Sequence, residues 1–143
     1  MKASELMLGD FLRYKQNFPF TQLQGKVVKV CGLDGRVDVR TIDDGKFHES
    51  EHPDWLEPIP LTQEILEKNF RGCKRGSGSL TYFVYELNEE YFIRASARSV
   101  DFCTHYDDSE HAAHDDIYLV ELKYVHTLQH VLPLYGIDKE ITI

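Results

Sequence analysis

The sequence has no long apolar run, few prolines and few cysteines, and these shortages exclude several classes of protein. Charged residues interrupt every hydrophobic stretch well before the roughly 20 residues that a membrane-spanning helix needs. The first residues, Met1 to Leu6, are not followed by the apolar stretch of a secretory signal. We therefore expect a soluble, cytoplasmic protein that does not act in a membrane.

Cysteine is too scarce for a disulfide framework. Cys31, Cys73 and Cys103 are odd in number, far apart and in no C-x-x-C pair. Such spacing is typical of unbridged thiols in a reducing compartment, and the simplest expectation is that each thiol is buried singly.

Basic residues become scarce toward the C-terminus. The net charge is −8, and residues 101–143 carry 2 basic and 9 acidic side chains, whereas residues 1–60 carry 8 and 10. A nucleic-acid-binding surface needs clustered lysine and arginine. The only such cluster is Lys68, Arg71, Lys74 and Arg75, which we interpret as a solvated helix end and loop. The charge distribution therefore argues against nucleic acid as the partner.

The first sixty residues predict short strands separated by turns. Residues 25–31 and 36–42 are β-branched runs, and Asp34-Gly35 between them favours a tight turn, so we expect a hairpin. Further expected elements are a strand at 8–14, a turn at 43–45, and an edge strand or exit loop at 55–60. The Gly9-Asp10 opening and the run from Gly25 to Val30 resemble SH3-like barrels, and this resemblance implies a scaffold without implying an activity.

The rest of the chain predicts two helices and more strands. Thr62 is a good N-cap for a helix that ends near Phe70, with Gly72 as its left-handed cap. We then expect a basic loop at 73–78, strands at 79–87, 91–95 and 117–120, a helix at 121–135 that stops at Gly136, and a final strand at 141–143. The predicted class is α+β and β-rich, with an SH3-like small barrel at 1–60 and a hairpin-and-two-helix unit at 61–143. The second unit either packs on the first or forms one continuous domain with it.

Three segments carry a wider resemblance. Leu56 to Thr62, Lys123 to Gln129 and Leu134 to Gly136 resemble small uncharacterised proteins of bacterial phages and mobile elements. In that group a barrel-like segment, a proline-flanked helix entry and a Tyr-Val-His helix follow in this order. The resemblance implies no activity, cofactor or catalytic residue.

An acidic stretch near residue 110 is the main candidate for binding. We interpret it as an exposed loop whose carboxylates meet a basic surface of a partner protein and speed association by electrostatic steering. The candidate binding residues are Asp107, Asp108, Glu110, Asp115 and Asp116.

The same stretch also offers ligands for a metal. His111 and His114 would share one face of a helical turn, and His105, Cys103 or a carboxylate would complete a zinc set. The alternative function is therefore a small metal-binding protein or metal-dependent enzyme that uses His105, His111 and His114 in the loop 103–116.

No other pattern indicates catalysis. The chain lacks a nucleophile elbow and a phosphate loop, and paired carboxylates such as Asp43-Asp44 are typical of turns. His126 and His130 lie four apart on the expected last helix, but Thr127 stands where a metalloprotease has its glutamate. We predict a non-enzymatic, protein-binding accessory protein without a cofactor, with zinc as the alternative.

Overall fold

The computed structural model describes residues 1–34, 36–108 and 113–143. The chain divides into two compact units, the first formed by residues 1–60 and 124–130 and the second by residues 61–123 and 131–143. Two antiparallel five-stranded sheets and two α-helices place the protein in the α+β class, as predicted.

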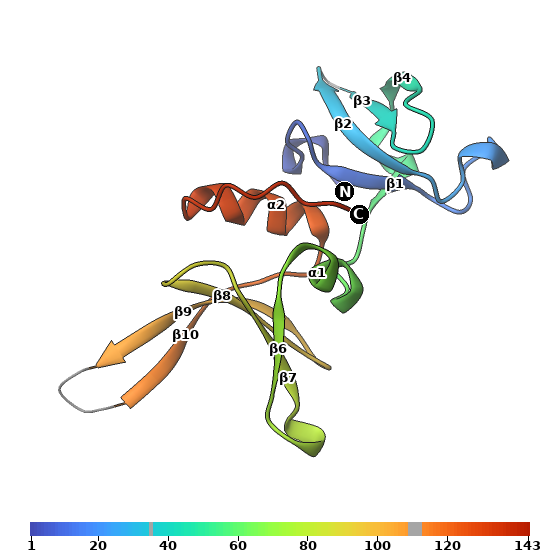
Figure 1. Ribbon diagram of the computed structural model, residues 1–143. Helices are drawn as coiled ribbons and strands as arrows, with labels where there is room; N and C mark the ends of the chain where they lie inside the picture. The colour runs from blue at the N-terminus through green and yellow to red at the C-terminus, as the bar shows by residue number, and fades with distance from the viewer. Residues whose placement is uncertain (35, 109–112) are drawn as a thin grey trace. The chain divides into compact units, whose positions relative to one another are not determined.

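The first unit is built on one sheet with the order β4-β3-β2-β1-β5 (Figure 1). Its strands are β1 (Phe11–Tyr14), β2 (Val27–Leu33), β3 (Val37–Thr41), β4 (Phe47–Glu51) and β5 (Leu56–Pro58), and its short 3₁₀ helices are η1 (Ala3–Glu5), η2 (Thr21–Leu23) and η3 (Pro53–Trp55). Alternate residues of β2 and β3 are buried, because a strand turns every second side chain to the same face, and in β1 Phe11 is buried in addition to the alternating Leu12 and Tyr14. The resulting core consists of Leu6, Leu12, Tyr14, Phe18, Val28, Val30, Val37, Val39 and Leu56.

The predicted hairpin, the following turn and the proline-flanked edge strand are confirmed. β2 and β3 pair antiparallel, Gly45 takes a positive φ of 67°, and β5 lies at the sheet edge. The strand β4 was not predicted, since Phe47–Glu51 has one apolar residue and no alternation. In the described residues neither sheet closes on itself, so the barrel closure expected for residues 1–60 is not seen.

The second unit has a sheet with the order β10-β9-β8-β7-β6. The strands are β6 (Gly72–Arg75), β7 (Tyr82–Glu86), β8 (Tyr91–Ser96), β9 (Val100–Asp108) and β10 (Ala113–Glu121), and a short 3₁₀ helix η4 (Gly78–Leu80) precedes β7. The helix α1 (Gln63–Asn69) begins as predicted, because the Thr62 hydroxyl accepts a hydrogen bond from Ile65 N at 3.3 Å. Buried side chains of this unit include Leu66, Tyr85, Phe92, Ile93, Phe102, Leu122, Leu132 and Ile141.

The prediction of a basic loop at 73–78 is wrong for residues 73–75. Residues 72–75 form the edge strand β6, which pairs with β7 from Gly72↔Tyr85 to Arg75↔Tyr82. Gly72 is not a left-handed cap, since its φ is not positive and the C-cap of α1 is Phe70 in extended conformation (φ −134°). A Cβ on Gly72 would meet the Tyr85 ring at 2.5 Å, so this glycine permits close approach of the ring to β6.

The last helix, α2 (Val125–Leu134), confirms the expected helical segment, with Pro133 in its final turn and Gly136 at a φ of 71° just beyond it. The division between the units falls within this helix, after His130. The strand expected at 141–143 does not form, and Thr142 instead exchanges two hydrogen bonds of 2.7 Å with the Asn69 amide.

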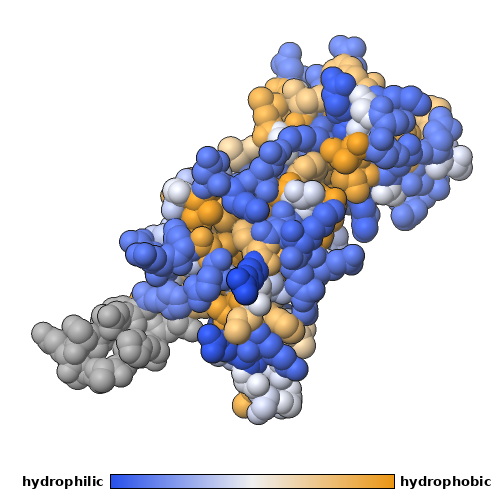
Figure 2. Space-filling model, viewed as in Figure 1, coloured by the Kyte–Doolittle hydropathy of each residue, from blue (hydrophilic) through white to orange (hydrophobic). Residues whose placement is uncertain are grey.

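Figure 2 shows hydrophobic residues that reach the surface among hydrophilic ones. The most exposed large apolar side chains are Leu8, Phe20, Leu80 and Leu134. The three cysteines are unbridged, as predicted, but only Cys103 is buried, while Cys31 and Cys73 are exposed. Over the described ranges, no helix has the length and apolar character that crossing a bilayer requires.

Candidate functional site

The acidic stretch near residue 110 folds as strands, which corrects the prediction of a loop. Residues 101–108 belong to β9 and residues 113–116 begin β10, so the two strands pair as a hairpin (Figure 1). The backbone of His114 lies in β10, so the helical turn that was expected to carry His111 and His114 does not include residue 114. Glu110 and His111 lie outside the described residues.

The end of this hairpin extends past its neighbouring strand. β8 pairs with β9 only as far as Tyr91↔Thr104, and β9 then continues to Asp108 with β10 beside it. Figure 1 shows this pair of strands running on beyond β8. We call residues 105–108 and 113–116 the acidic ribbon. His105 N still donates to Glu90 O at 3.1 Å, just before β8, and no described residue of β8 is paired with β9 beyond Thr104.

The register of the acidic ribbon sets no acidic position directly opposite another. Asp107 lies opposite His114, Asp108 opposite Ala113, and the remaining pairs are Tyr106↔Asp115 and His105↔Asp116. Like charges directly opposite each other destabilise a sheet, and this register avoids such pairs. The chain has no lysine or arginine between Arg98 and Lys123, so histidine is the only basic residue type in this segment.

His105 is held at the base of the ribbon. Its ring stacks on Phe92 with centroids 4.4 Å apart, and its Nε2 lies 3.5 Å from the Glu86 carboxylate on β7. Cys103, which the sequence offered as a further metal ligand, is fully buried in the sheet. Among the side chains that the structure describes, no group of three histidine, cysteine or acidic residues could hold a metal ion.

A second polar cluster lies in the first unit and joins the start of β1 to α2. Asp10 is 1% exposed, and its carboxylate accepts a hydrogen bond from Met7 N at 2.8 Å and contacts His130 Nε2 at 2.7 Å. The neighbouring Gln129 side chain donates to Gly9 O and accepts from Phe11 N, both at 3.0 Å. Both carboxylate oxygens and both ends of the amide are thus used to fix backbone and helix, which is a structural role.

His126 lies beside this cluster. Its ring stacks parallel to Tyr124 at 5.7 Å and meets His130 edge-on at the same distance. Burial lowers the pKa of His126, and its buried Nδ1 has no hydrogen-bond partner among the described residues. The sequence placed both histidines correctly on the last helix, but nothing in it indicated that Asp10, about 120 residues away, contacts His130.

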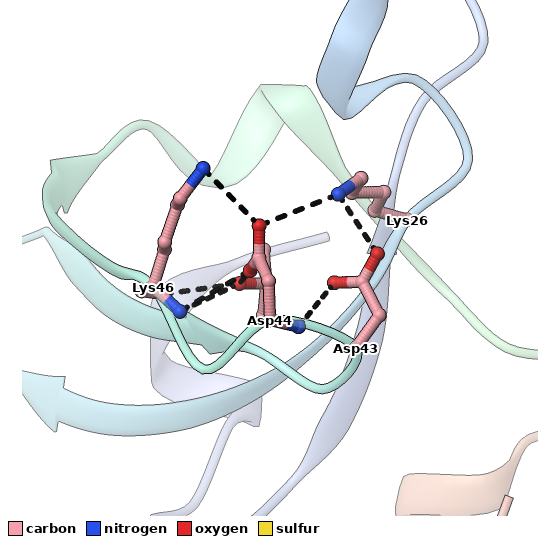
Figure 3. Close-up of polar contacts among 5 residues, drawn as sticks. Lys26, Asp43, Asp44 and Lys46 are labelled. Carbon is pink, nitrogen blue, oxygen red and sulfur yellow. Dashed lines mark hydrogen bonds and ion pairs between the residues drawn. The ribbon is translucent and has the colours of Figure 1, made fainter.

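Asp43 and Asp44 form part of the turn between β3 and β4, as predicted. Figure 3 shows Lys26 Nζ between the two carboxylates, 2.8 Å from Asp43 and 3.6 Å from Asp44, while Lys46 Nζ lies 3.4 Å from Asp44. The Thr41 hydroxyl donates to Asp44, and this bond is the main cause that lowers the pKa of Asp44. These contacts stabilise the turn.

Comparisons of the chain with protein-family models, with curated proteins and with solved structures find no match.

Proposed function

We propose that this protein is a non-enzymatic, protein-binding accessory protein of a phage or mobile element. Its acidic ribbon would dock on a basic surface of a partner protein through Asp107, Asp108, Glu110, Asp115 and Asp116. The observation that carries this proposal is the ribbon itself, which continues past β8 and holds acidic residues on both strands. Residues 99–122 contain no lysine or arginine, and such a concentration of carboxylates is complementary to a basic surface on a partner.

The proposal is tested by neutralising the described carboxylate positions of the ribbon. The variant Asp107→Asn, Asp108→Asn, Asp115→Asn and Asp116→Asn is compared with a control that changes net charge equally. The control neutralises four exposed acidic residues elsewhere, namely Glu49, Glu64, Glu89 and Asp138. Affinity capture from a bacterial lysate with quantitative mass spectrometry would identify partners, and the binding constant of each purified partner would follow.

We expect a partner with a basic surface that binds the unaltered chain and the control equally and binds the ribbon variant at least about tenfold more weakly. Binding should also weaken as salt is raised, because dissolved ions screen the attraction between opposite charges. A partner that the ribbon variant retains at full affinity would overturn the proposal.

A metal-binding protein is the second candidate, and the register of the ribbon favours it. Residues two apart on a strand and residues opposite each other share one face of a sheet. By register, the positions His105, Asp107, His114 and Asp116 therefore share a face of the ribbon. Imidazole and carboxylate are ligands that zinc accepts.

Native mass spectrometry of protein purified without chelator and then given one equivalent of zinc tests this candidate. Zinc bound to the unaltered chain and lost in His114→Ala, but kept in His111→Ala, would support the register set. Loss in both variants would support the set His105, His111 and His114. An unaltered chain without bound zinc would remove the metal candidate.

For the first unit we keep the SH3-like scaffold as a proposal. The strands β1 to β4 follow one another as an antiparallel meander, and β5 returns to the free side of β1 after the short helix η3, which supports it. A scaffold of this kind implies no activity by itself.

A further inference from the structure

The second unit contains a pocket that the proposed function does not use. It has a volume of about 430 Å³, within the range of small-molecule sites. The segment 79–82 forms one wall, and the end of β8, the turn 97–99 and Asp101 form the other. Its side chains are two arginines, one aspartate and five hydroxyl groups, together with Leu80 and Ala97.

Arg94 is anchored so that most of its guanidinium group remains available. Its Nη2 forms an ion pair with Asp101 at 3.6 Å, and the Ser99 hydroxyl donates to the same carboxylate at 2.8 Å. The Asp101 side chain is only 10% exposed, whereas that of Arg94 is 39% exposed. A guanidinium group has five N–H donors in a rigid fork, so a single carboxylate contact leaves donors directed elsewhere.

Two further arginines make this region positive. Arg98 lines the pocket from the turn after β8. Arg75 lies opposite Tyr82, which in turn lies opposite Ser96, so all three share one face of the sheet. Among the described residues neither Arg98 nor Arg75 has an ion-pair partner. This region therefore contains three arginines and one carboxylate, although the net charge of the chain is −8.

The turn that carries Arg98 is fixed by its own hydrogen bonds. The Ser96 hydroxyl accepts from Arg98 N at 3.3 Å and from Ser99 N at 3.2 Å, and Ser96 N donates to Ser99 O at 2.9 Å. On the opposite wall, Gly76 has a φ of 73°, and a Cβ there would collide with Leu80 O, so only glycine fits the start of this wall. The backbone conformation of both walls is therefore fixed without a ligand.

We propose that this pocket binds a small organic phosphate. The free donors of Arg94 and Arg98, with the hydroxyl groups of Ser79 and Tyr82, match a group that has several anionic oxygens. Leu80, which is 78% exposed at the rim, and the Tyr82 ring would contact an apolar or planar part of the ligand. This inference is independent of the acidic ribbon, so either can fail without the other.

The test titrates the ¹⁵N-labelled full chain with adenosine monophosphate and, separately, with inorganic phosphate, and follows the backbone amide resonances. We expect saturable shifts at residues 79–82 and 96–101, with tighter binding of the nucleotide. Arg98→Ala should weaken binding at least about tenfold, because a charge-assisted hydrogen bond is lost. Arg94→Lys should also weaken it, since lysine keeps the charge but not the fork.

Arg71→Ala is the matched control, because it removes the same charge from an exposed residue outside the pocket. It should change the affinity less than about twofold, since distant exposed charges are screened. Arg98 is exposed and has no ion pair to lose among the described residues, so its variant should keep the spectrum of the folded chain. Absence of saturable shifts, an equal loss in Arg71→Ala, or preference for a DNA oligonucleotide over the nucleotide would each overturn the proposal.

Discussion

Two hairpins of this protein carry paired aspartates, and they differ in whether lysine lies close to these carboxylates in the fold or the sequence. Between β3 and β4, Lys26 and Lys46 form ion pairs with Asp43 and Asp44, and the Thr41 hydroxyl donates a hydrogen bond to Asp44 (Figure 3). In the acidic ribbon, the same residue type recurs at four positions in a segment with no lysine or arginine. Carboxylates that are paired with nearby lysines stabilise the fold, whereas carboxylates concentrated in a segment without lysine or arginine are suited to binding a basic partner.

Asp10 is a buried carboxylate with both oxygens in polar contacts, and removing it should have the largest effect. Asp10→Ala leaves Met7 N and His130 without their acceptor in a buried site, so we expect the free energy of unfolding to fall by about 2–4 kcal/mol. Trp55 is the only tryptophan and lies in this unit, so its fluorescence during urea unfolding reports the change. Glu49→Ala, at an exposed position on β4, is the control, and an equal loss there would contradict the role given to Asp10.

The charged turn should be the next most sensitive place. Thr41 is buried and its hydroxyl bonds Asp44, Lys46 N and Lys46 O. Thr41→Val keeps the shape but removes these bonds, so we expect a loss of about 1–2 kcal/mol by the same tryptophan measurement. Thr21→Val changes an exposed threonine of the same unit and should alter stability by less than about 0.5 kcal/mol. If Thr21→Val lowered the free energy of unfolding as much as Thr41→Val, the hydrogen bonds of the Thr41 hydroxyl would not be the cause of the loss.

Acidification should weaken the first unit through His126. Burial lowers the pKa of this imidazole in the folded state, while neighbouring Asp10 and Glu5 act to raise it and His130 to lower it. Between the lowered pKa and the unfolded value of about 6.5, the unfolded chain binds more protons, so stability falls as pH falls. One proton limits the slope to about 1.4 kcal/mol per pH unit. Urea unfolding at several pH values should lose this component in His126→Gln and keep it in His52→Gln.

The smallest effect on stability is expected in the ribbon. Neutralising Asp107, Asp108, Asp115 and Asp116 removes charges from a segment that has no lysine or arginine. The free energy of unfolding, obtained from thermal unfolding followed by circular dichroism, should therefore stay constant or rise by no more than about 0.5 kcal/mol. A loss as large as that of Thr41→Val would mean that these carboxylates belong to the fold, and the comparison between the two hairpins would fail.

Local patterns predicted the elements whose causes are local. The Thr62 cap, the β2–β3 hairpin and the stop at Gly136 depend on residues within a few positions of each other, and all three are confirmed. Elements whose cause lies in a distant partner were missed. The strand β6 has no apolar pattern and exists because β7 pairs with it, and β9 was predicted as a loop because its acidic composition resembles one.

The sites divide in the same way. The acidic composition of the segment was enough to predict these residues as binding candidates. Their register, which sets histidines opposite aspartates, depends on strand pairing and could not be predicted. The contact between Asp10 and His130 joins the two ends of the chain, and the pocket around Arg94 is assembled from a loop, a turn and a strand. No spacing within the sequence predicts such convergence, because it depends on the packing of distant segments.

The positions of the three thiols allow the distance between the two units to be followed by spectroscopy. Cys31 lies in the first unit and Cys73 in the second, both exposed, while Cys103 is enclosed in a sheet. Burial raises the pKa of the Cys31 thiol, so at neutral pH it forms less thiolate and reacts more slowly with a maleimide dye. A donor and an acceptor dye on the two exposed thiols would place one label in each unit. Energy transfer between them would follow the separation of the two units in the native sequence, before and after a ligand or partner is added.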